Sequence, residues 1–416
     1  MTIATGVTWA IAGLSTAGVI IRPMRWPEWV WAIAGAALIV AFGLLPPASA
    51  IAAICKGRDV YLFLIGMMLL SETAREHGVF DWVAAIAVNL ANGSGARLFL
   101  LVYTTGVLVT TLLSNDATAV VLTPAVFAVA RRARAEPLPL LLACALVANA
   151  ASFVLPISNP ANLVLYGGHM PPLGQWLGSF ALPSLASIVA TFVILRLMER
   201  KLIVGECARD VERPVLAGGG KLALAGILLT ALLLVVMSSL DLQLGLPTAI
   251  AGIATALIVS LLAGRSPVAL ARRVSWGVLL LVAGMFVLVE ALDGTGVIAM
   301  VAAAMRAVAL DPVPGAAAAG ATLAVASNLM NNLPAGLVAS LAVAEAAPTR
   351  IVTDALLIGV DLGPNLSVTG SLATILWLQA IRREGEDVGF WRFFRVGAVA
   401  MPVALLAAIA ARLLNA

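Results

Sequence analysis

Two carboxylates stand out because each lies in a polar stretch of a chain that is otherwise rich in apolar residues. Asp116 lies in 114–124 (S-N-D-A-T-A-V-V-L-T-P), and Asp361 begins 361–371 (D-L-G-P-N-L-S-V-T-G-S). An ionisable group among apolar segments is costly and indicates function, and a carboxylate in a water-poor site can exchange a proton with its surroundings. We therefore expect proton coupling at Asp116 and Asp361. The alternative is that each caps the N-terminus of a half-helix.

Amides and hydroxyls gather in four such stretches, two in each half of the chain. The other two are 148–167, which contains S-N-P-A-N, and 327–334 (S-N-L-M-N-N-L-P). None of the four contains Arg, Lys or His, which favours a neutral or cationic substrate over a dicarboxylate. The predicted substrate-binding residues are Asn115, Thr118, Ser158, Asn159, Asn162, Asn331, Asn332, Asn365, Thr369 and Ser371. The alternative for each asparagine is a structural role, which we expect for Asn149 and Asn328 as helix-to-helix hydrogen bonders.

Composition indicates where these stretches must lie. Hydrophobic residues make up 62% of the 416 residues, charged residues 11%, and mean hydropathy is +1.06, far from a soluble domain. The chain is therefore expected to be an all-α polytopic membrane protein. Pro156 and Pro160 should unwind a span, and irregular backbone is tolerated in lipid only where it lines a protein cavity or water. Broken spans at matching places in two halves are typical of a transporter's binding site.

The hydropathy pattern predicts about ten spans in two halves. The first half is 1–198, the connecting polar linker 199–220, and the second half 221–416. Each half is expected to contain a re-entrant hairpin (97–131 and 314–345) and a broken helix (138–168 and 350–382), since the hairpin arms look short for a full crossing. The remaining spans are expected at about 3–21, 27–44, 58–75, 175–198, 221–240, 247–263, 276–292 and 392–413.

The two halves repeat one another. Gly66-Met67, Glu72 and Gly78-Val79 recur at a constant offset as Gly284-Met285, Glu290 and Gly296-Val297. The ten-span topology leaves only five of the 25 basic residues outside, which is a strong positive-inside bias. This topology makes the repeats inverted, and it argues against a nucleic-acid partner. The predicted outside residues are Lys56, Arg58, Arg306, Arg350 and Arg412.

The motifs S-N-D-A-T-A-V-V-L-T-P, S-N-P-A-N, N-N-L-P and D-L-G-P-N-L-S-V-T-G-S-L-A-T-I-L-W-L resemble those of the arsenite efflux pumps (ArsB type) of the ion transporter superfamily. The resemblance covers nearly the whole chain. It implies efflux of As(III) and Sb(III) as neutral trihydroxides, coupled to proton influx across the bacterial cytoplasmic membrane, and arsenical resistance. An arsenite-stimulated ATPase subunit is a candidate partner besides the lipid bilayer. The metalloid is then cargo at the binding residues, with no cofactor and no structural metal.

Other functions remain as alternatives. A sodium/proton antiporter, or another anion transporter of the same superfamily, is the main one. A channel would need a continuous polar path, whereas the polar stretches are concentrated at four points. An enzyme would need a nucleophile with a base or a set of metal ligands, and His77 and His169 lie near span ends, where an interfacial role is expected. We expect Asn115, Asn159, Asn331 and Thr369 to meet in one cavity near the bilayer midplane.

Overall fold

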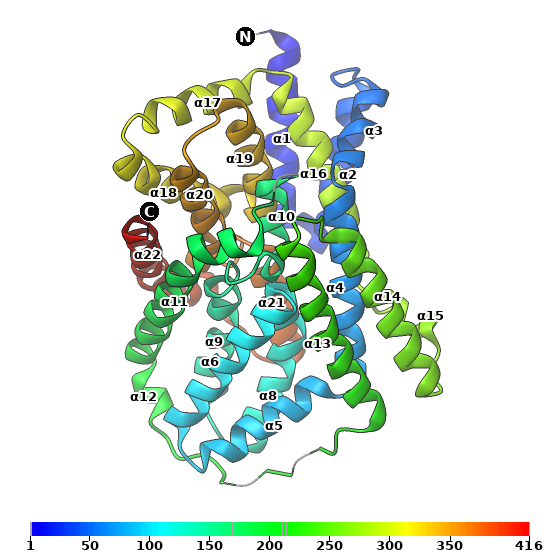
Figure 1. Ribbon diagram of the computed structural model, residues 1–416, viewed down its shortest axis with the longest axis vertical. Coiled ribbons are helices and arrows are strands. Elements are labelled where there is room, and N and C mark those ends of the chain that lie inside the picture. Colours follow the sequence, from blue (N-terminus) through cyan, green and yellow to red (C-terminus); the bar gives the residue numbers. More distant parts are fainter. Residues whose placement is uncertain (1, 168–169, 210, 213, 416) are drawn as a thin grey trace.

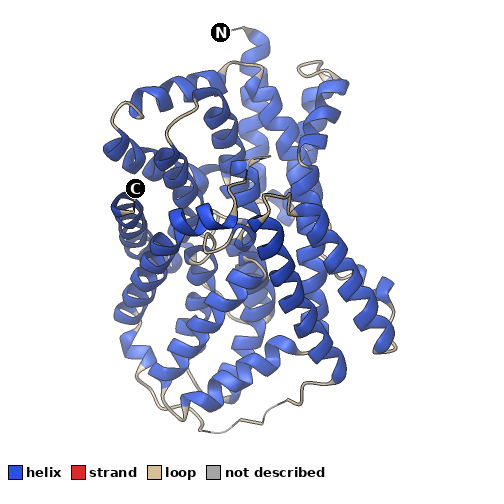
Figure 2. Ribbon diagram, viewed as in Figure 1, coloured by secondary structure: helices blue, strands red, loops and turns tan. Residues whose placement is uncertain are grey.

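The computed structural model describes residues 2–167, 170–209, 211–212 and 214–415. Within these ranges the fold is all-α, and the only β-type pairing is an isolated bridge between Ser94 and Glu206 (Figure 2). The predicted class, a polytopic helical membrane protein, is confirmed. His169, which was expected at an interface, lies outside the described residues.

The first half contains a broken helix that is followed by one more continuous helix (Figure 1). Its elements are α1 (Ile3–Ile21), α2 (Glu28–Ala41), α3 (Pro47–Lys56), α4 (Arg58–Glu76), α5 (Val79–Ala91), α6 (Gly95–Leu112), α7 (Asn115–Ala117), a π-helical turn η2 (Thr118–Leu122), α8 (Thr123–Arg132), α9 (Pro137–Ala150), a 3₁₀ turn η3 (Pro156–Ser158), α10 (Pro160–Tyr166) and α11 (Leu173–Met198). Helix α3 was not predicted, and it begins at Pro47, where the ring's fixed φ suits a first helical turn.

The second half follows the same order of elements. It comprises α12 (Arg200–Ile203), α13 (Gly218–Ser239), α14 (Gly245–Leu262), α15 (Pro267–Ala271), α16 (Gly277–Asp293), α17 (Val297–Val308), α18 (Pro312–Met330), α19 (Asn332–Ala346), α20 (Arg350–Leu362), a 3₁₀ turn η4 (Gly363–Leu366), α21 (Leu372–Arg383) and α22 (Phe390–Leu414). Helices α5 and α17 both start at the Gly-Val pair of the repeat. The first hairpin lies in the lower half of Figure 1 and the second in the upper half. Inversion of the repeats stays a prediction.

Span lengths refine the predicted topology. Seven described helices are long and apolar enough to cross a membrane, or eight if α16 and α17, bent by 78°, form one span. The predicted ten spans comprise five of these seven (α1, α11, α13, α14 and α22) together with α2, α4, α16 and the two broken helices. Two of the seven are the first hairpin arms α6 (18 residues) and α18 (19 residues), which are longer than expected. Re-entry of the hairpins therefore stays a prediction.

The halves pack crosswise through small residues. Gly66 of α4 lies against the backbone of Thr248 on α14, and the repeat-related Gly284 of α16 lies against Ala32 on α2. A side chain at either glycine would meet the neighbouring backbone, so glycine permits the close approach of two helices in a membrane. Helices α4 and α2 of the first half therefore pack directly against helices α14 and α16 of the second half.

The polar linker is more ordered than its composition suggests. The glycines of 218–220, which were assigned to the linker from the sequence, form the first turn of α13, where the long apolar run that follows offsets glycine's low helix propensity. The linker also packs on the first half, since the Cys207 amide donates to the Gly93 carbonyl at 3.0 Å and the Ala208 amide to the Ala133 carbonyl at 2.7 Å.

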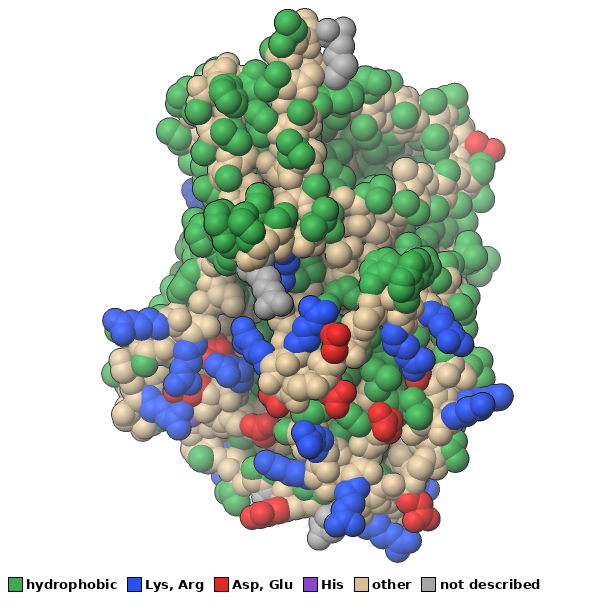
Figure 3. Space-filling view, turned by 180° about the vertical axis from the view of Figure 1, so that it is seen from behind, with side chains coloured by type: hydrophobic (Ala, Val, Ile, Leu, Met, Phe, Trp, Pro, Cys, Tyr) green, Lys and Arg blue, Asp and Glu red, His purple; other side chains and the backbone are tan. Residues whose placement is uncertain are grey.

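Charged side chains are segregated on the surface. On the face shown in Figure 3, Lys, Arg, Asp and Glu gather over the lower half, while apolar side chains cover the upper half. The repeat-related glutamates both form ion pairs, Glu72 with Arg75 and Glu290 with Lys56. Surface segregation of this kind is what a membrane-embedded protein with one basic side requires.

Candidate functional site

The tip of the first hairpin is held by its own polar side chains. The Ser114 hydroxyl accepts from the Ala117 amide at 3.3 Å, and the Asn115 side-chain oxygen accepts from the Asp116 amide at 2.9 Å. The hydroxyl of Thr118 lies 2.8 Å from that of Thr110 on α6. These bonds satisfy the backbone donors that a helix start leaves free.

A π-helical turn follows this tip for a local reason. Pro124 has no N–H to donate and its ring displaces the carbonyl one turn back, so the backbone widens over η2 (Thr118–Leu122). The hydroxyl of Thr123 donates to the Thr118 carbonyl at 3.0 Å and satisfies one acceptor that the widened turn exposes. The polar tip and the proline together give an irregular backbone inside an apolar helix pair.

The first break lies between α9 and α10, where Pro156 and Pro160 were expected to unwind the chain. The Asn162 amide donates to the carbonyls of Ser152 (2.9 Å) and Pro156 (3.2 Å), and Ser158 donates to the Thr111 carbonyl (3.1 Å). Side chains thus take up the carbonyls that the break leaves without helical partners. In this structure Asn162 and Ser158 hold the broken backbone in place.

The second break, between α20 and α21, is built in the same way. Asn328 of α18 donates to the Gly363 carbonyl at 2.8 Å and accepts from the Ser367 hydroxyl at 2.7 Å. Ser371 caps α21 by accepting from the Thr374 amide at 3.1 Å, and the Thr369 hydroxyl lies 3.1 Å from that of Ser367.

The second hairpin tip touches this break. Asn331 has a φ of 73°, which turns the chain sharply between α18 and α19, and its side-chain oxygen caps Leu333 at 3.4 Å. The Asn332 amide donates to the Gly370 carbonyl at 2.9 Å. The tip of one element and the break of another therefore form one continuous polar segment.

The two breaks are tied to each other across the halves. The Asn149 amide of α9 donates to the Asn365 side-chain oxygen at 2.9 Å, and the Asn365 amide donates to the Leu146 carbonyl at 3.0 Å. In the other direction, the Asn159 amide donates to an Asp361 carboxylate oxygen at 2.7 Å. All of these side chains are buried, and the second Asp361 oxygen has no partner among the described residues.

A cavity of about 580 Å³ reaches the first hairpin tip. Among its lining residues, Ser114, Ala117 and Pro160 are buried and Asp116 is half-buried, whereas Arg75, Arg273 and Arg383 are exposed, so the first four form its deep end. Its walls come mainly from α4, η2, α8 and α21. Arg75, Arg273 and Arg383 line it as well, and all three belong to the set predicted inside, so the cavity opens toward the predicted cytoplasmic side. The deep end contains a carboxylate and small polar groups but no cation.

Among the predicted binding and coupling residues, Asp116 alone lines this cavity. Asp361 is fully buried, with 0% of its surface exposed, and does not reach it. Asn115, Asn159, Asn331 and Thr369 do not line it either, because their polar groups cap helices or bind neighbouring side chains. Contact of these residues with substrate stays a prediction.

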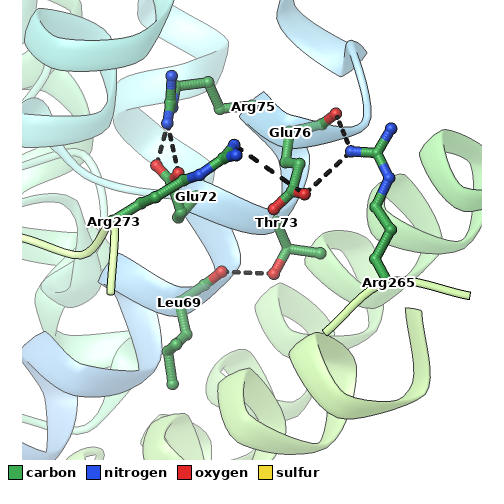
Figure 4. Close-up of polar contacts among 7 residues, drawn as sticks. All are labelled: Leu69, Glu72, Thr73, Arg75, Glu76, Arg265 and Arg273. Carbon is green, nitrogen blue, oxygen red and sulfur yellow. Dashed lines mark hydrogen bonds and ion pairs between the residues drawn. The ribbon is translucent and has the colours of Figure 1, made fainter. Parts of the chain in front are cut away.

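The mouth of the cavity carries an ion-pair cluster that sequence reasoning did not single out (Figure 4). At the end of α4, Glu72 pairs with Arg75, while Glu76 lies 2.9 Å from Arg265 and 4.0 Å from Arg273 of the α14–α16 connection. The only signal in the sequence was the predicted inside position of these arginines.

His77 follows this cluster directly, and burial lowers the pKa of its imidazole, with nearby Arg265 as the second cause.

No metal centre is apparent among the described residues, where no group of three or more His, Cys, Asp or Glu could hold an ion. Cys55 is exposed, while Cys144 and Cys207 are buried, and all three are free thiols. They lie in separate elements, so the thiols cannot form a three-sulfur cage around a metalloid in this arrangement.

Comparisons with known proteins agree with this arrangement. Residues 16–363 match the family profile described as citrate transporter (CitMHS). An arsenical pump membrane protein of Escherichia coli is 28% identical over 366 residues, covering 84% of this chain and 85% of the relative. A protein of the same name in Yersinia enterocolitica is 28% identical over 368 residues, again with 84% and 85% covered.

Solved structures share the fold. The YdaH transporter of Alcanivorax borkumensis superposes with a TM-score of 0.59 at 17% sequence identity, covering 88% of this chain and 86% of that one. MtrF of Neisseria gonorrhoeae, described as an antimetabolite efflux pump, gives a TM-score of 0.50 at 12% identity, with 90% and 83% covered. At these identities the likeness concerns the fold alone.

Proposed function

This chain belongs to the citrate transporter (CitMHS) family, and from that premise we propose that it exports arsenite and antimonite as neutral trihydroxides, coupled to proton influx across the bacterial cytoplasmic membrane. That it is a membrane transporter follows from the family and the fold. The curated relatives named arsenical pump membrane proteins support the proposed cargo.

One observation carries the choice of substrate. The deep end of the cavity presents Ser114, Asp116 and Ala117, with no Arg, Lys or His. A tricarboxylate such as citrate would need cations or free helix N-termini aimed at it. The N-termini of α7 and α10 at this end are already capped by Ser114 and Asn159, and at the mouth Arg75 pairs with Glu72 while Arg273 lies 4.0 Å from Glu76. A small neutral hydroxide needs only donors and acceptors, which this end supplies.

Asp116 is the residue that we propose exchanges protons with the cytoplasm. Its side chain is half-buried and lines the cavity, and no described residue hydrogen-bonds its carboxylate oxygens. Asp361, the second proposed coupling residue, is sealed in this conformation and bound to Asn159. A proton can therefore reach Asp116 from the cavity, while Asp361 requires a different conformation before it can exchange one.

The test is uptake into everted membrane vesicles from a host that lacks arsenical resistance. As(III), Sb(III), citrate and Na⁺ are offered separately, with and without an imposed proton gradient and with no ATP. We expect gradient-dependent accumulation of As(III) and Sb(III). Sodium-dependent proton movement without metalloid uptake would instead support the sodium/proton antiporter, and citrate uptake would contradict the neutral substrate. Addition of ATP then tests the proposed ATPase partner.

Asp116→Asn tests the coupling in the same vesicles. The amide keeps the shape of the side chain but stays neutral, so the variant should bind As(III) and lose gradient-driven uptake. Asp81→Asn is the matched control, since Asp81 also lines the cavity but lies on α5, away from the hairpin tip. Equal uptake by the Asp116→Asn and wild-type proteins, with the same dependence on external pH, would place the proton elsewhere.

A further inference from the structure

Helix α10 lies between two separate spaces. Its first residue, Pro160, lines the deep end of the large cavity. Leu163, one turn later, and Gly167, just past the helix end, line a small pocket of about 40 Å³. The helix has seven residues, which is about 10 Å of length at 1.5 Å per residue. A single short helix therefore forms part of the barrier between the cavity and this pocket.

The small pocket lies at the opposite end of the bundle from the cavity mouth. It is lined by Asp59, at the start of α4, whose other end carries Arg75 at the mouth. It is also lined by residues 241–244, which join α13 to α14, while the polar linker enters α13 at its other end. The pocket thus faces the side that the charge bias predicts to be outside.

Two carboxylates of α20 hold the two ends of α10. The Tyr166 hydroxyl donates to an Asp354 oxygen at 2.5 Å, and Asn159, the N-cap of α10, donates to an Asp361 oxygen at 2.7 Å. Asp354 and Asp361 are seven residues apart, so they lie on one face of α20. The short helix is therefore attached at both of its ends to one face of α20.

The outer attachment, between Tyr166 and Asp354, can open at a modest cost in free energy. The other Asp354 oxygen accepts from Arg412 of α22 at 2.8 Å, and Arg350 lies 3.7 Å away. Asp354 is fully buried, and removing the only cation from a buried carboxylate is strongly destabilising. Because both arginines stay with Asp354 when Tyr166 leaves, opening of this outer attachment breaks one hydrogen bond and leaves the ion pair intact.

We propose that α10 is the outer gate of the transporter, and that the hydrogen bond between Tyr166 and Asp354 is its latch. Movement of α10 away from α20 joins the large cavity to the outer pocket and exposes the substrate pathway to the outside. The proposal rests on the transport function but not on the identity of the cargo.

The test is thiol labelling from the outside, in right-side-out vesicles with a charged, membrane-impermeant methanethiosulfonate. All three native cysteines are changed to Ser, and Leu163→Cys reports on the gate because Leu163 is only 3% exposed in the closed state. Tyr166→Phe removes the latch hydroxyl but keeps the ring that packs against Trp176. The loss of a hydrogen bond to a charged group should raise the labelling rate about tenfold or more.

Leu165→Cys is the matched control, since Leu165 is equally buried on the same helix and lines neither space. It should stay unlabelled in both backgrounds. Labelling of Ser275→Cys, which is exposed at the cavity mouth, in everted vesicles shows that the variant is present in the membrane in the expected orientation, while protection of Leu165→Cys shows that α10 is still packed. If Tyr166→Phe does not accumulate, Tyr166→Leu, which also lacks the latch hydroxyl and keeps an apolar side chain, replaces it in the same assay with the same expected increase in labelling.

The proposed gate would be refuted if removal of the latch did not raise the labelling rate of Leu163→Cys, provided that Ser275→Cys in the same background is labelled normally. Failure of As(III) transport with an intact labelling response would refute the proposed cargo and leave the gate standing.

Discussion

Asn159 offers the sharpest test of the link between the two halves, because one side chain makes two separable bonds. Its oxygen accepts from the Ala161 amide at 3.0 Å and caps α10, while its amide donates to Asp361 at 2.7 Å. Loss of an N-cap costs about 1 kcal/mol, and loss of a hydrogen bond to a charged group about 1.5–3 kcal/mol. Asn159→Ala should therefore lower the free energy of unfolding by about 2.5–4 kcal/mol.

Asn159→Ser separates the two contributions. Serine is a good N-cap but is too short to reach Asp361, so this variant should lose only the second bond, about 1.5–3 kcal/mol. The assay is reversible unfolding of the purified protein by titration with dodecyl sulfate in mixed micelles, followed by tryptophan fluorescence. The expected order of stability is wild type, then Ser, then Ala.

Repeating both variants in an Asp361→Asn background completes a double-mutant cycle. The energy that couples Asn159 to residue 361 should fall when the carboxylate becomes an amide. Wild-type stability in Asn159→Ala, or an unchanged coupling energy in the cycle, would refute the bond that ties the first break to α20.

Further outcomes follow from single side chains. Changing all three cysteines to Ser should leave arsenite resistance of a sensitive host near wild type, because the proposed site holds arsenite by hydrogen bonds and not by thiolates; loss of resistance with normal expression would contradict this. Asp361→Asn alone should raise the free energy of unfolding by about 1 kcal/mol or more, since a carboxylate with an unpartnered buried oxygen is removed, and should impair proton-driven transport in vesicles. The pKa of His77 lies below 6.5 in the folded protein, so its contribution to stability is present above that pH and lost as the pH falls through it. His77→Gln should accordingly lose less stability than wild type as the pH falls below 6.5, and an identical loss in both would exclude His77 as the cause.

The comparison with known families bears on which cargo the chain transports. The profile that matches the chain carries the name of a citrate transporter, whereas the curated relatives are arsenical pumps. Both use the same fold, so the fold cannot decide the cargo. The absence of a cation at the deep end of the cavity is the feature that favours a neutral hydroxide, and the vesicle assay with citrate compares the two directly.

Some of the fold could be predicted because it depends on local chemistry. Composition alone requires a membrane protein, and prolines such as Pro156 and Pro160 must interrupt a helix wherever they fall in its interior. The resemblance to arsenical pumps also came from residues close together in the chain, and the relatives support it. The unpredicted helix α3 and the ordered start of α13 were missed because weak local signals there are overridden by packing.

The candidate site depends on contacts between residues far apart in the chain, which no local sequence pattern predicts. Hydropathy does not say which face of a helix meets which neighbour, so it could not pair Asn149 with Asn365 or Asn159 with Asp361, residues more than 200 positions apart. Nor could it tell Asp116, which lines the cavity, from Asp361, which is sealed. The sequence by itself determined the class of protein, the positions of the breaks and the residues able to do the chemistry. Only the packing of the two halves decided which of those residues face water and which hold the halves together, because that depends on the rotation and crossing of helices distant in the chain.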